Sequence, residues 1–384
     1  MTTMSTTQTT RPAMREELKY FFCLFVTLLP LTWSAGYVKL IRLAHVRFGR
    51  KIIEVATFRS GDINESDLII HDNCWGTVEE DAVRRDFTIN ALFYDPSEGT
   101  IIDYVGGVED VKRRLLVTIG DPVMRFKQDP VRMIRLLKFC ARFTLRVKKE
   151  TMASLEECRE EILKSAPARV LEEMFKMLES GAGAPFFRYM TEAGLLELIF
   201  PVLAEHLKGE CNKEIYAYLN LADTLILHRS PDSLPRSVLV SSILFPLLVR
   251  AIEPLLQKGK TSLHLGKIND LIDHLIHTVF VDAFAHFPRK MRSSMNFVLN
   301  AQYRMTPLQD PSKLKSTNKR FRRIMDNEEF PMALALLEMR SMIDPSTRAN
   351  FIDWQRAYYS YIEEIGGVPR KRERRPRRRF SQAK

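Results

Sequence analysis

Cysteine is scarce in this sequence, with five residues in 384, an odd number scattered along the chain. No two of them form a C-x-x-C pair, so the pattern excludes a zinc ribbon and a disulfide framework. Scattered cysteines suit a reducing compartment, and we therefore expect a cytoplasmic protein. They are Cys23, Cys74, Cys140, Cys158 and Cys211.

Positive charge is unevenly distributed along the chain. The 58 Lys and Arg residues exceed the 47 Asp and Glu residues and give a net charge of +11. Residues 370–384 contain nine basic residues and one acid, which leaves only +3 for residues 1–369. The like charges of this tail repel one another, and Pro376 interrupts any helix. The charge predicts a polyanionic partner, whereas the 45% of hydrophobic residues exclude a wholly disordered chain.

One apolar run lies near the N-terminus, from Tyr20 to Leu31, and it continues without charge to Val38. With Arg15 and Lys19 before it, the run resembles a secretory signal. It is marginal for a membrane span, which needs about 20 residues. A buried helix, or a segment foreign to the domain that follows, is the alternative, and we expect no membrane partner.

The first third of the chain shows the pattern of strands and turns. Two β-rich runs in residues 41–58 flank residues 48–51 and predict a hairpin. A further strand is expected over residues 87–94, followed by a turn at 95–99 and a strand at 100–105. The stretch between the two pairs is polar and predicts irregular structure.

Helical periodicity replaces this pattern after about residue 120. Apolar residues recur at helical spacing over residues 130–143, and Pro167 begins a second helix that ends near Gly181. We expect no strand beyond residue 120 and see no repeat of fixed period. The sequence thus predicts a small α/β part followed by a long helical part.

The first candidate site residue is Glu54, in the middle of the predicted second strand. Ile53 and Val55 flank it, and Arg59 follows five positions later. A carboxylate buried in a sheet is costly without a cation or a metal ion. Glu54 therefore marks such a site, or else it is an edge-strand glutamate that faces water.

A second cluster lies in RRDFTINAL, where Arg84, Arg85, Asp86 and Asn90 enter one predicted strand. Arginines form forked, charge-assisted hydrogen bonds to triphosphate oxygens, and Asp and Asn suit ribose hydroxyls. The alternative is an internal network of salt bridges that holds the strand in place.

A third cluster lies in RFKQDPVRMIR, residues 125–135. Asp129 and Arg132 are three positions apart and are predicted to share a helix face in the first turn. They can present an acceptor and donors to the edge of a base. The alternative is a pair that only stabilises the N-terminus of the helix.

Three segments carry a family resemblance: RRDFTINAL, IDYVGGVEDV at Ile102–Val111, and IGDPVMRFKQDPVRMIRLLKF at Ile119–Phe139. Together they resemble the class II nucleotidyltransferases, the family of bacterial poly(A) polymerases and tRNA CCA-adding enzymes. The resemblance extends from about Leu43 through Glu173. It implies an α+β fold in which a truncated β-polymerase-like nucleotidyltransferase head is followed by an all-α neck and body.

The same resemblance implies a reaction. The family transfers a nucleoside monophosphate from a nucleoside triphosphate to an RNA 3′ end and releases pyrophosphate. Two Mg²⁺ ions, held by carboxylates of the head, activate the 3′ hydroxyl and stabilise the leaving group. The implied domains are a divergent segment 1–41, an incomplete head 42–120, a helical neck 121–181, a helical body 182–368 and a basic tail 369–384.

Matching positions carry the family's site residues to this sequence. Glu54 resembles the third metal-binding carboxylate of the head, and Arg59, Arg169 and Glu172 resemble supporting residues. Gln128 stands where many relatives have Glu. The residues that resemble the nucleotide-binding set are Arg84, Arg85, Asp86, Asn90, Asp129, Arg132 and Arg135.

Within the family, the string IIEVATFRSGD and the arginine-rich end favour the adenylating branch. We expect a polynucleotide adenylyltransferase with ATP as substrate, RNA 3′ ends as partner and no DNA partner. The tail is expected to bind RNA phosphates, with a localisation or solubility appendage as the alternative. The tail residues concerned are Arg370, Lys371, Arg372, Arg374, Arg375, Arg377, Arg378 and Arg379.

One family motif is missing from the sequence. The head of the family begins with a glycine turn and an Asp-x-Asp pair that holds both metals, and residues 1–42 contain only Glu16 and Glu17 as carboxylates. One carboxylate is a poor host for Mg²⁺. We therefore expect weak nucleotide binding and poor catalysis from this chain, and a truncated or replaced N-terminus is our hypothesis. A degenerate relative is the alternative to truncation. The alternatives to the adenylyltransferase function are a CCA-adding enzyme, a non-catalytic RNA-binding relative and a membrane-associated protein.

Overall fold

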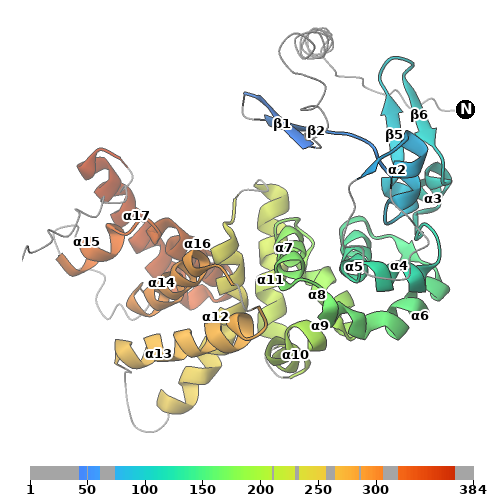
Figure 1. Ribbon diagram of the computed structural model, residues 1–384. Helices are drawn as coiled ribbons and strands as arrows, with labels where there is room; N and C mark the ends of the chain where they lie inside the picture. The colour runs from blue at the N-terminus through green and yellow to red at the C-terminus, as the bar shows by residue number, and fades with distance from the viewer. Residues whose placement is uncertain are drawn as a thin grey trace, which may run out of the picture. The chain divides into compact units, whose positions relative to one another are not determined.

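The computed structural model describes residues 43–49, 51–60, 74–209, 212–229, 233–256, 264–284, 287–305 and 319–367 (Figure 1). They fall into two compact units, each described by itself: one contains the described residues up to Arg84, the other those from Arg85 onward. The predictions for residues 1–41, including the apolar run, and for the basic tail lie outside the described residues.

The first unit opens with a two-stranded antiparallel hairpin of β1 (Leu43–Phe48) and β2 (Lys51–Ala56). Gly49 turns the chain with a φ of +60°, a conformation that glycine adopts without strain. The hairpin predicted at this position is confirmed. A second short pair follows, in which β3 (Arg59–Ser60) is antiparallel to β4 (Cys74–Trp75).

The first unit ends with helix α2 (Val78–Arg84), where we expected irregular structure. Its start is a capping box: the Thr77 hydroxyl accepts from the Glu80 N–H at 3.2 Å, and the Glu80 carboxylate accepts from the Thr77 N–H at 2.7 Å. Arg84 is therefore the last residue of a helix, and the prediction that it enters a strand is wrong.

The second unit begins with a short 3-10 helix, Thr88–Asn90, before β5 (Leu92–Asp95). The predicted strand at residues 87–94 is thus only half correct. The side-chain oxygen of Asn90 accepts from the N–H of Phe87 at 3.2 Å and so closes a turn in place of a sheet ladder. The predicted hairpin then follows, with β6 (Thr100–Asp103) antiparallel to β5.

Asp103 organises the start of α3 (Gly107–Arg113). Its carboxylate accepts from the backbone N–H groups of Val105, Gly106, Gly107 and Val108 at 2.9–3.1 Å. A Cβ on Gly107 would lie 2.2 Å from the Thr88 carbonyl oxygen, so only glycine lets α3 approach the 3-10 helix this closely. The motif IDYVGG is explained by these local demands.

One more strand pair follows, in which β7 (Leu115–Leu116) runs parallel to β8 (Arg146–Val147). The prediction that no strand occurs after residue 120 is therefore wrong. A strand of two residues is too short to show an alternation of apolar and polar residues in the sequence. The strand β8 forms because the chain returns to β7 after two helices.

Helices make up the rest of the described chain, as the sequence predicted. The helices around the candidate site and the middle of the chain are α4 (Pro122–Gln128), α5 (Val131–Phe143), α6 (Lys149–Cys158), the 3-10 helix Arg159–Lys164, α7 (Pro167–Leu178), α8 (Gly183–Glu192), α9 (Leu195–Ile199) and α10 (Pro201–Lys208). The later ones are α11 (Asn212–His228), α12 (Arg236–Leu256), α13 (Leu265–Ile276), a π-helical turn His277–Val281, α14 (Arg289–Met305), α15 (Lys319–Met325), α16 (Phe330–Ile343), the 3-10 helix Pro345–Thr347 and α17 (Arg348–Ile365).

A large hydrophobic core runs through the second unit from Phe87 to Met339. Helix α12 is part of it, and its stretch Arg236–Leu255 is the one helix among the described residues that is long and apolar enough to cross a membrane. Since 67% of that window is buried inside the protein, a core helix accounts for it.

A second, smaller core lies between α14, α15, α16 and α17. Its centre is the fully buried Trp354, whose indole N–H donates to the carbonyl of Met305 at 3.0 Å. The short strands and the long helical part confirm the α+β fold class. The domain boundaries given above stay predictions.

Candidate functional site

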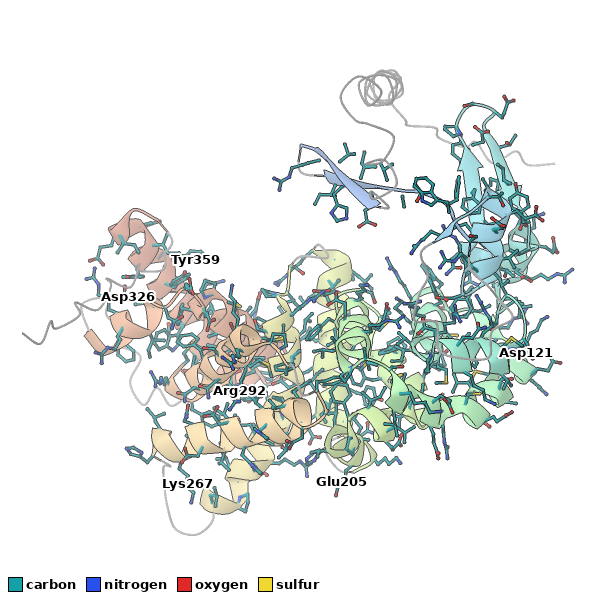
Figure 2. The ribbon with its side chains drawn as sticks, in the orientation of Figure 1. Asp121, Glu205, Lys267, Arg292, Asp326 and Tyr359 are labelled. Carbon is teal, nitrogen blue, oxygen red and sulfur yellow. The ribbon has the colours of Figure 1, made fainter. Side chains whose placement is uncertain are left out.

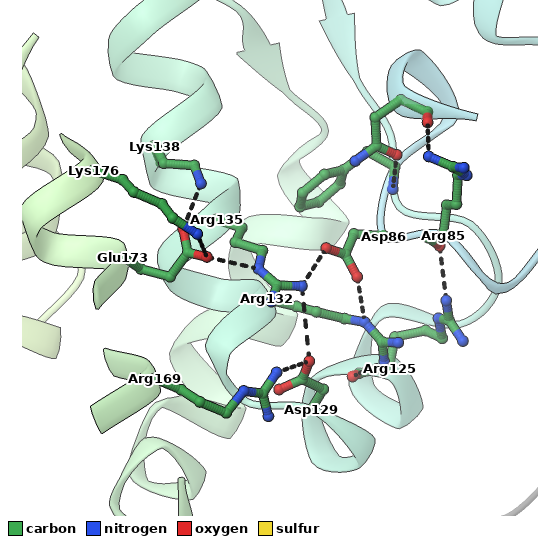
Figure 3. A network of polar contacts seen from close by, with 12 residues as sticks. Arg85, Asp86, Arg125, Asp129, Arg132, Arg135, Lys138, Arg169, Glu173 and Lys176 are labelled. Carbon is green, nitrogen blue, oxygen red and sulfur yellow. Dashed lines mark hydrogen bonds and ion pairs between the residues drawn. The ribbon is translucent and has the colours of Figure 1, made fainter. Parts of the chain in front are cut away.

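Asp86 lies between two arginines of α5 (Figure 3). Its Oδ1 accepts from Nε of Arg132 at 2.7 Å, and its Oδ2 accepts from Nη1 of Arg135 at 2.8 Å. Burial alone would raise the pKa of Asp86, because the charged form loses water. The charges and hydrogen bonds of Arg135 and Arg132 outweigh burial, so the pKa lies below its ordinary value.

The guanidinium of Arg132 is enclosed by protein, with only 6% of the side chain exposed. Besides Asp86 it contacts the carbonyl of Arg125, to which its Nη1 donates at 2.9 Å. Arg125 in turn donates to the carbonyl of Arg85 at 2.7 Å. These contacts join α4 and α5 to the segment that carries Asp86, so Arg132 acts here by holding Asp86 in position.

Asp129 precedes helix α5 instead of lying on it. Its backbone is extended, with φ −145° and ψ 90°, and its carbonyl accepts from the Arg132 N–H at 3.0 Å. The prediction that Asp129 and Arg132 share a helix face is therefore wrong. Pro130 is the reason, because the residue before proline is driven out of the helical region.

The Asp129 carboxylate faces other arginines. Its Oδ2 accepts from Nη2 of Arg169, in α7, at 2.9 Å and lies 3.8 Å from Nη1 of Arg135. Its Oδ1 is buried, and no group of the described residues hydrogen-bonds to it. An acceptor without a partner is unfavourable unless a ligand or water supplies a donor. Asp129 thus has one acceptor without a partner among the described residues, and Arg169 lies beside its other oxygen.

Glu173 joins α7 to α5 and was missed in the sequence (Figure 3). Its carboxylate lies 3.4 Å from Nε of Arg135, contacts the Lys138 ammonium and lies 3.7 Å from Nζ of Lys176. Burial acts to raise the pKa of Glu173, but these cations lower it overall. Glu173 follows Arg169 by four positions, and this spacing on one helix face was the available signal.

Glu172, which we expected to support the site, points to another partner. It accepts from both terminal nitrogens of Arg236 at 2.8 and 3.0 Å, and Glu179 accepts from the same guanidinium at 2.6 and 2.9 Å. These bonds join α7 to α12. Glu172 therefore contributes to the position of α7 through the body and does not contact Asp86 or Asp129.

These charged side chains form one group, which we call the Asp86 cluster. It has five cations and three carboxylates, a net charge of +2, in a partly buried position. Its members are Asp86, Asp129, Arg132, Arg135, Lys138, Arg169, Glu173 and Lys176.

Arg85 and Asn90 lie next to each other in the second unit. Arg85 donates to the Asn90 carbonyl at 3.2 Å, and its guanidinium carbon lies 5.1 Å from the centre of the Phe93 ring. The Arg85 side chain is exposed and can reach a ligand. Asn90 uses its side-chain oxygen to close the turn at Phe87, which leaves its amide N–H groups for other contacts.

The remaining predicted residues belong to the first unit. Arg84 lies 3.9 Å from Asp81, whose carboxylate also accepts from the backbone N–H of Arg59 at 3.2 Å. Glu54 lies in β2 with 69% of its side chain exposed, 3.5 Å from His45. The predicted tail residues lie outside the described part of the chain.

The described residues do not fit a magnesium site. Among them no group of three or more His, Cys, Asp or Glu side chains has an arrangement that could hold a metal ion, and Glu54 has a histidine, not a second carboxylate, beside it. Mg²⁺ prefers several oxygen ligands in near-octahedral geometry.

Two family profiles match this chain. The poly A polymerase head domain matches residues 32–117, and the domain described as the probable RNA and SrmB-binding site of polymerase A matches residues 144–207. The second match covers α6 to α10. These helices include α7, which carries the cluster residues Arg169, Glu173 and Lys176.

Curated relatives give the same result over most of the chain. Poly(A) polymerase I of Haemophilus influenzae is 31% identical over 368 residues, which is 88% of this chain and 77% of that protein. Poly(A) polymerase I of Escherichia coli is 30% identical over the same length, with 76% of that protein covered. The multifunctional CCA protein of Stenotrophomonas maltophilia is 35% identical over 164 residues, which is 41% of this chain and 40% of that protein.

A solved structure shares the fold. The CCA-adding enzyme of Bacillus stearothermophilus, in complex with CTP, superposes with a TM-score of 0.53 at 22% identity. The match covers 83% of this chain and 66% of that one. The family profiles and the curated relatives together define a nucleotidyltransferase. The chain belongs to the family that contains the bacterial poly(A) polymerases and the CCA-adding enzymes.

Proposed function

We propose that this protein is a template-independent polynucleotide adenylyltransferase that adds AMP from ATP to RNA 3′ ends. The 3′ hydroxyl of the RNA loses its proton to water, and its oxygen bonds to the α-phosphorus of ATP. The bond from that phosphorus to the oxygen that bridges to the β-phosphate breaks, and pyrophosphate leaves. Two relatives named poly(A) polymerase I, at 30–31% identity and over three quarters of their length, support adenylate as the transferred group.

The observation that carries the proposal is the Asp86 cluster. Asp86 holds Arg132 and Arg135 at 2.7 and 2.8 Å, and Arg135 lies next to Asp129, the carboxylate with a free acceptor. In the proposed role, Oδ1 of Asp129 accepts from the exocyclic amine of adenine. The net positive charge of the cluster attracts the phosphates, and the exposed Arg85 is a further phosphate ligand.

Arg132 has a different role in this proposal from the one that its position in the sequence suggested. Since it is enclosed between Asp86 and the Arg125 carbonyl, it positions Asp86 and does not read the base. Arg169, with 51% of its side chain exposed, is the cation beside Asp129 that a ligand can reach.

Incorporation of labelled ATP into an oligo(A) primer in the presence of Mg²⁺ tests the proposal. We expect slow AMP incorporation by the wild type and none by Arg132→Ala, because Arg132 holds Asp86 in position. ATP binding should be retained in Glu54→Ala, which lies outside the cluster. If the wild type binds RNA but incorporates no AMP, a non-catalytic RNA-binding role replaces the proposed one.

A CCA-adding activity is the second candidate, because the multifunctional CCA protein is 35% identical over 164 residues. Supplying CTP and a tRNA without its 3′ terminus separates the two activities. Addition of C to this tRNA would favour the CCA-adding function, whereas exclusive use of ATP on unstructured primers would eliminate it.

The basic tail and the location complete the proposal. Residues 370–384, with eight net positive charges, are proposed to hold RNA phosphates without reading sequence. Their deletion should weaken RNA binding and reduce its salt dependence, and an unchanged salt dependence would refute the role. The scattered cysteines and the RNA substrate support a cytoplasmic location.

A further inference from the structure

Helices α13 and α14 line an open cavity of about 430 Å³ in the helical body, together with residues that precede α16. None of its lining residues belongs to the Asp86 cluster, which lies on α5, α7 and the segments before α5. A cavity of this volume falls within the range that holds a nucleotide-sized ligand. No part of the proposed transfer reaction uses it.

The floor of the cavity is a connected polar network. Asn296 and Asn269 donate to the two oxygens of Asp273 at 2.9 and 3.2 Å. Asn300 donates to Asn269 at 3.3 Å, and Arg304 donates from Nε to Asn300 at 3.0 Å. Both oxygens of Asp273 accept hydrogen bonds, so its negative charge is partly offset. The network also holds these lining side chains in fixed positions.

Two arginines on the cavity wall have no such bonds. Within the part of the chain that the structure describes, the guanidinium groups of Arg289 and Arg292 have no hydrogen-bond or ion-pair partner, although both line the cavity. They are three positions apart on α14 and so lie on one face of the helix. Figure 2 marks the place of Arg292 on this helix.

The charges and shape of the cavity favour a phosphate ligand. Three arginines line it against two carboxylates, Asp273 and Glu329, and Glu329 is already bonded to the Ser294 hydroxyl. Free guanidinium groups bind phosphate oxygens in forked geometry. The half-buried ring of Phe297 also lines the cavity and offers an apolar surface on which a base can stack.

We propose that this cavity binds the phosphate and an adjacent base of single-stranded RNA, upstream of the 3′ end that is extended. This inference rests on the proposed function for its choice of RNA. Amide groups and an aromatic ring beside free arginines suit a nucleotide, because bases combine hydrogen-bonding edges with a face that stacks. An acidic peptide would use the arginines but neither the ring nor the amides.

Equilibrium binding of a fluorescently labelled 20-residue oligo(A) RNA tests the site in the full-length chain. The variant Arg289→Ala/Arg292→Ala removes both free guanidinium groups. Its matched control, Lys267→Ala/Lys290→Ala, also removes two positive charges. Lys267 lies on α13 and Lys290 on α14, and both are exposed residues that do not line the cavity. Arg289→Lys/Arg292→Lys keeps the charge without the forked geometry, and circular dichroism compares the folding of all variants.

We expect the arginine-to-alanine variant to bind RNA at least about tenfold more weakly, with a salt slope lower by about 1.4. The lysine-to-alanine control should stay within about threefold of wild type, and the arginine-to-lysine variant should lie between. Equal weakening in variant and control, or none in either, would overturn the proposal.

Binding of two further ligands, ATP and a poly-glutamate peptide, distinguishes RNA from other anionic ligands of the cavity. Loss of ATP binding with unchanged RNA binding in the arginine variant would show a site for free nucleotide and overturn the RNA assignment. If the arginine variant loses more affinity for a poly-glutamate peptide than for RNA, the RNA assignment is overturned as well. Binding is measured without nucleotide addition, so absence of AMP transfer would contradict the proposed function and leave this test intact.

Discussion

Arg132 donates from Nε to Oδ1 of Asp86 at 2.7 Å and so joins residues 46 positions apart in the sequence. The pair is nearly enclosed, with 6% and 13% of the two side chains exposed. A charge in such a place is tolerated only because its partner is fixed beside it. The pair is thus the connection between the α5 helix and the segment that carries the proposed phosphate ligands.

Replacing Asp86 with Asn should destabilise the second unit by about 3 kcal/mol, because Arg132 and Arg135 lose a buried counter-charge while the shape is kept. Urea unfolding followed by circular dichroism measures the change. Glu109→Gln is the control: its ion pair with Arg113 at 3.0 Å is more than half exposed and should contribute under about 1 kcal/mol. Equal losses in both variants would contradict the account.

Acid should destabilise the protein through the same carboxylates. The pKa values of Asp86 and Glu173 lie below their ordinary values of 3.8 and 4.5, because cations outweigh burial. Groups with a lowered folded pKa stabilise above the unfolded value, and this contribution is lost as pH falls through the folded one. The urea concentration at the midpoint of unfolding should therefore decrease as the pH falls below about 4.5, and it should decrease less steeply in Asp86→Asn. Parallel curves for wild type and variant would refute this.

Arg236 should not be replaceable by lysine. Its guanidinium binds Glu172 and Glu179 and lies 4.9 Å from the Phe175 ring, so one planar group joins α7 to α12. Arg236→Lys loses the forked geometry and should destabilise the fold by about 1 kcal/mol. A double-mutant cycle with Glu172→Gln measures the coupling, and Lys208–Glu197, a single exposed contact at 2.6 Å, is the matched control. No coupling would show that the contact contributes nothing.

Cys140 should be unreactive in the native state. Burial raises the pKa of its thiol to about 12, so almost no thiolate forms at neutral pH. A thiol reagent at pH 8, followed by peptide mass spectrometry, should leave Cys140 unlabelled until urea unfolds the protein. Labelling of native Cys140 at the unfolded rate would contradict its buried position.

Local signals in the sequence predicted the local structure well. The hairpin around Gly49 and the helix that begins at Pro167 were predicted correctly, because turn glycines and helix-start prolines act within a few residues. The helix α2 could also have been predicted, since Thr77 and Glu80 form the T-x-x-E signature of a capping box. The family resemblance supplied the fold class.

The partners within the candidate site could not be obtained in this way. Asp86 contacts Arg135 across 49 positions. The spacing of Glu173 from Arg169 shows that the two share a face of α7, but it does not show which residue of α5 that face meets. That choice depends on the rotation of α7 against α5, which packing of the whole core decides. The helix that follows Pro130 was likewise predicted correctly. The extended backbone of Asp129, the residue before this proline, was not predicted.

The most direct test of the central claim is nucleotide selection by Asp129 in the oligo(A) incorporation assay with competing ATP and GTP, because guanine has a carbonyl where adenine has its exocyclic amine. We expect the wild type to incorporate AMP in preference to GMP. We also expect Asp129→Ala to lose most of this preference while the fold, monitored by circular dichroism, is retained. Unchanged preference in Asp129→Ala, or preferred incorporation of GMP by the wild type, would contradict the assignment of Asp129 as the residue that accepts from the exocyclic amine.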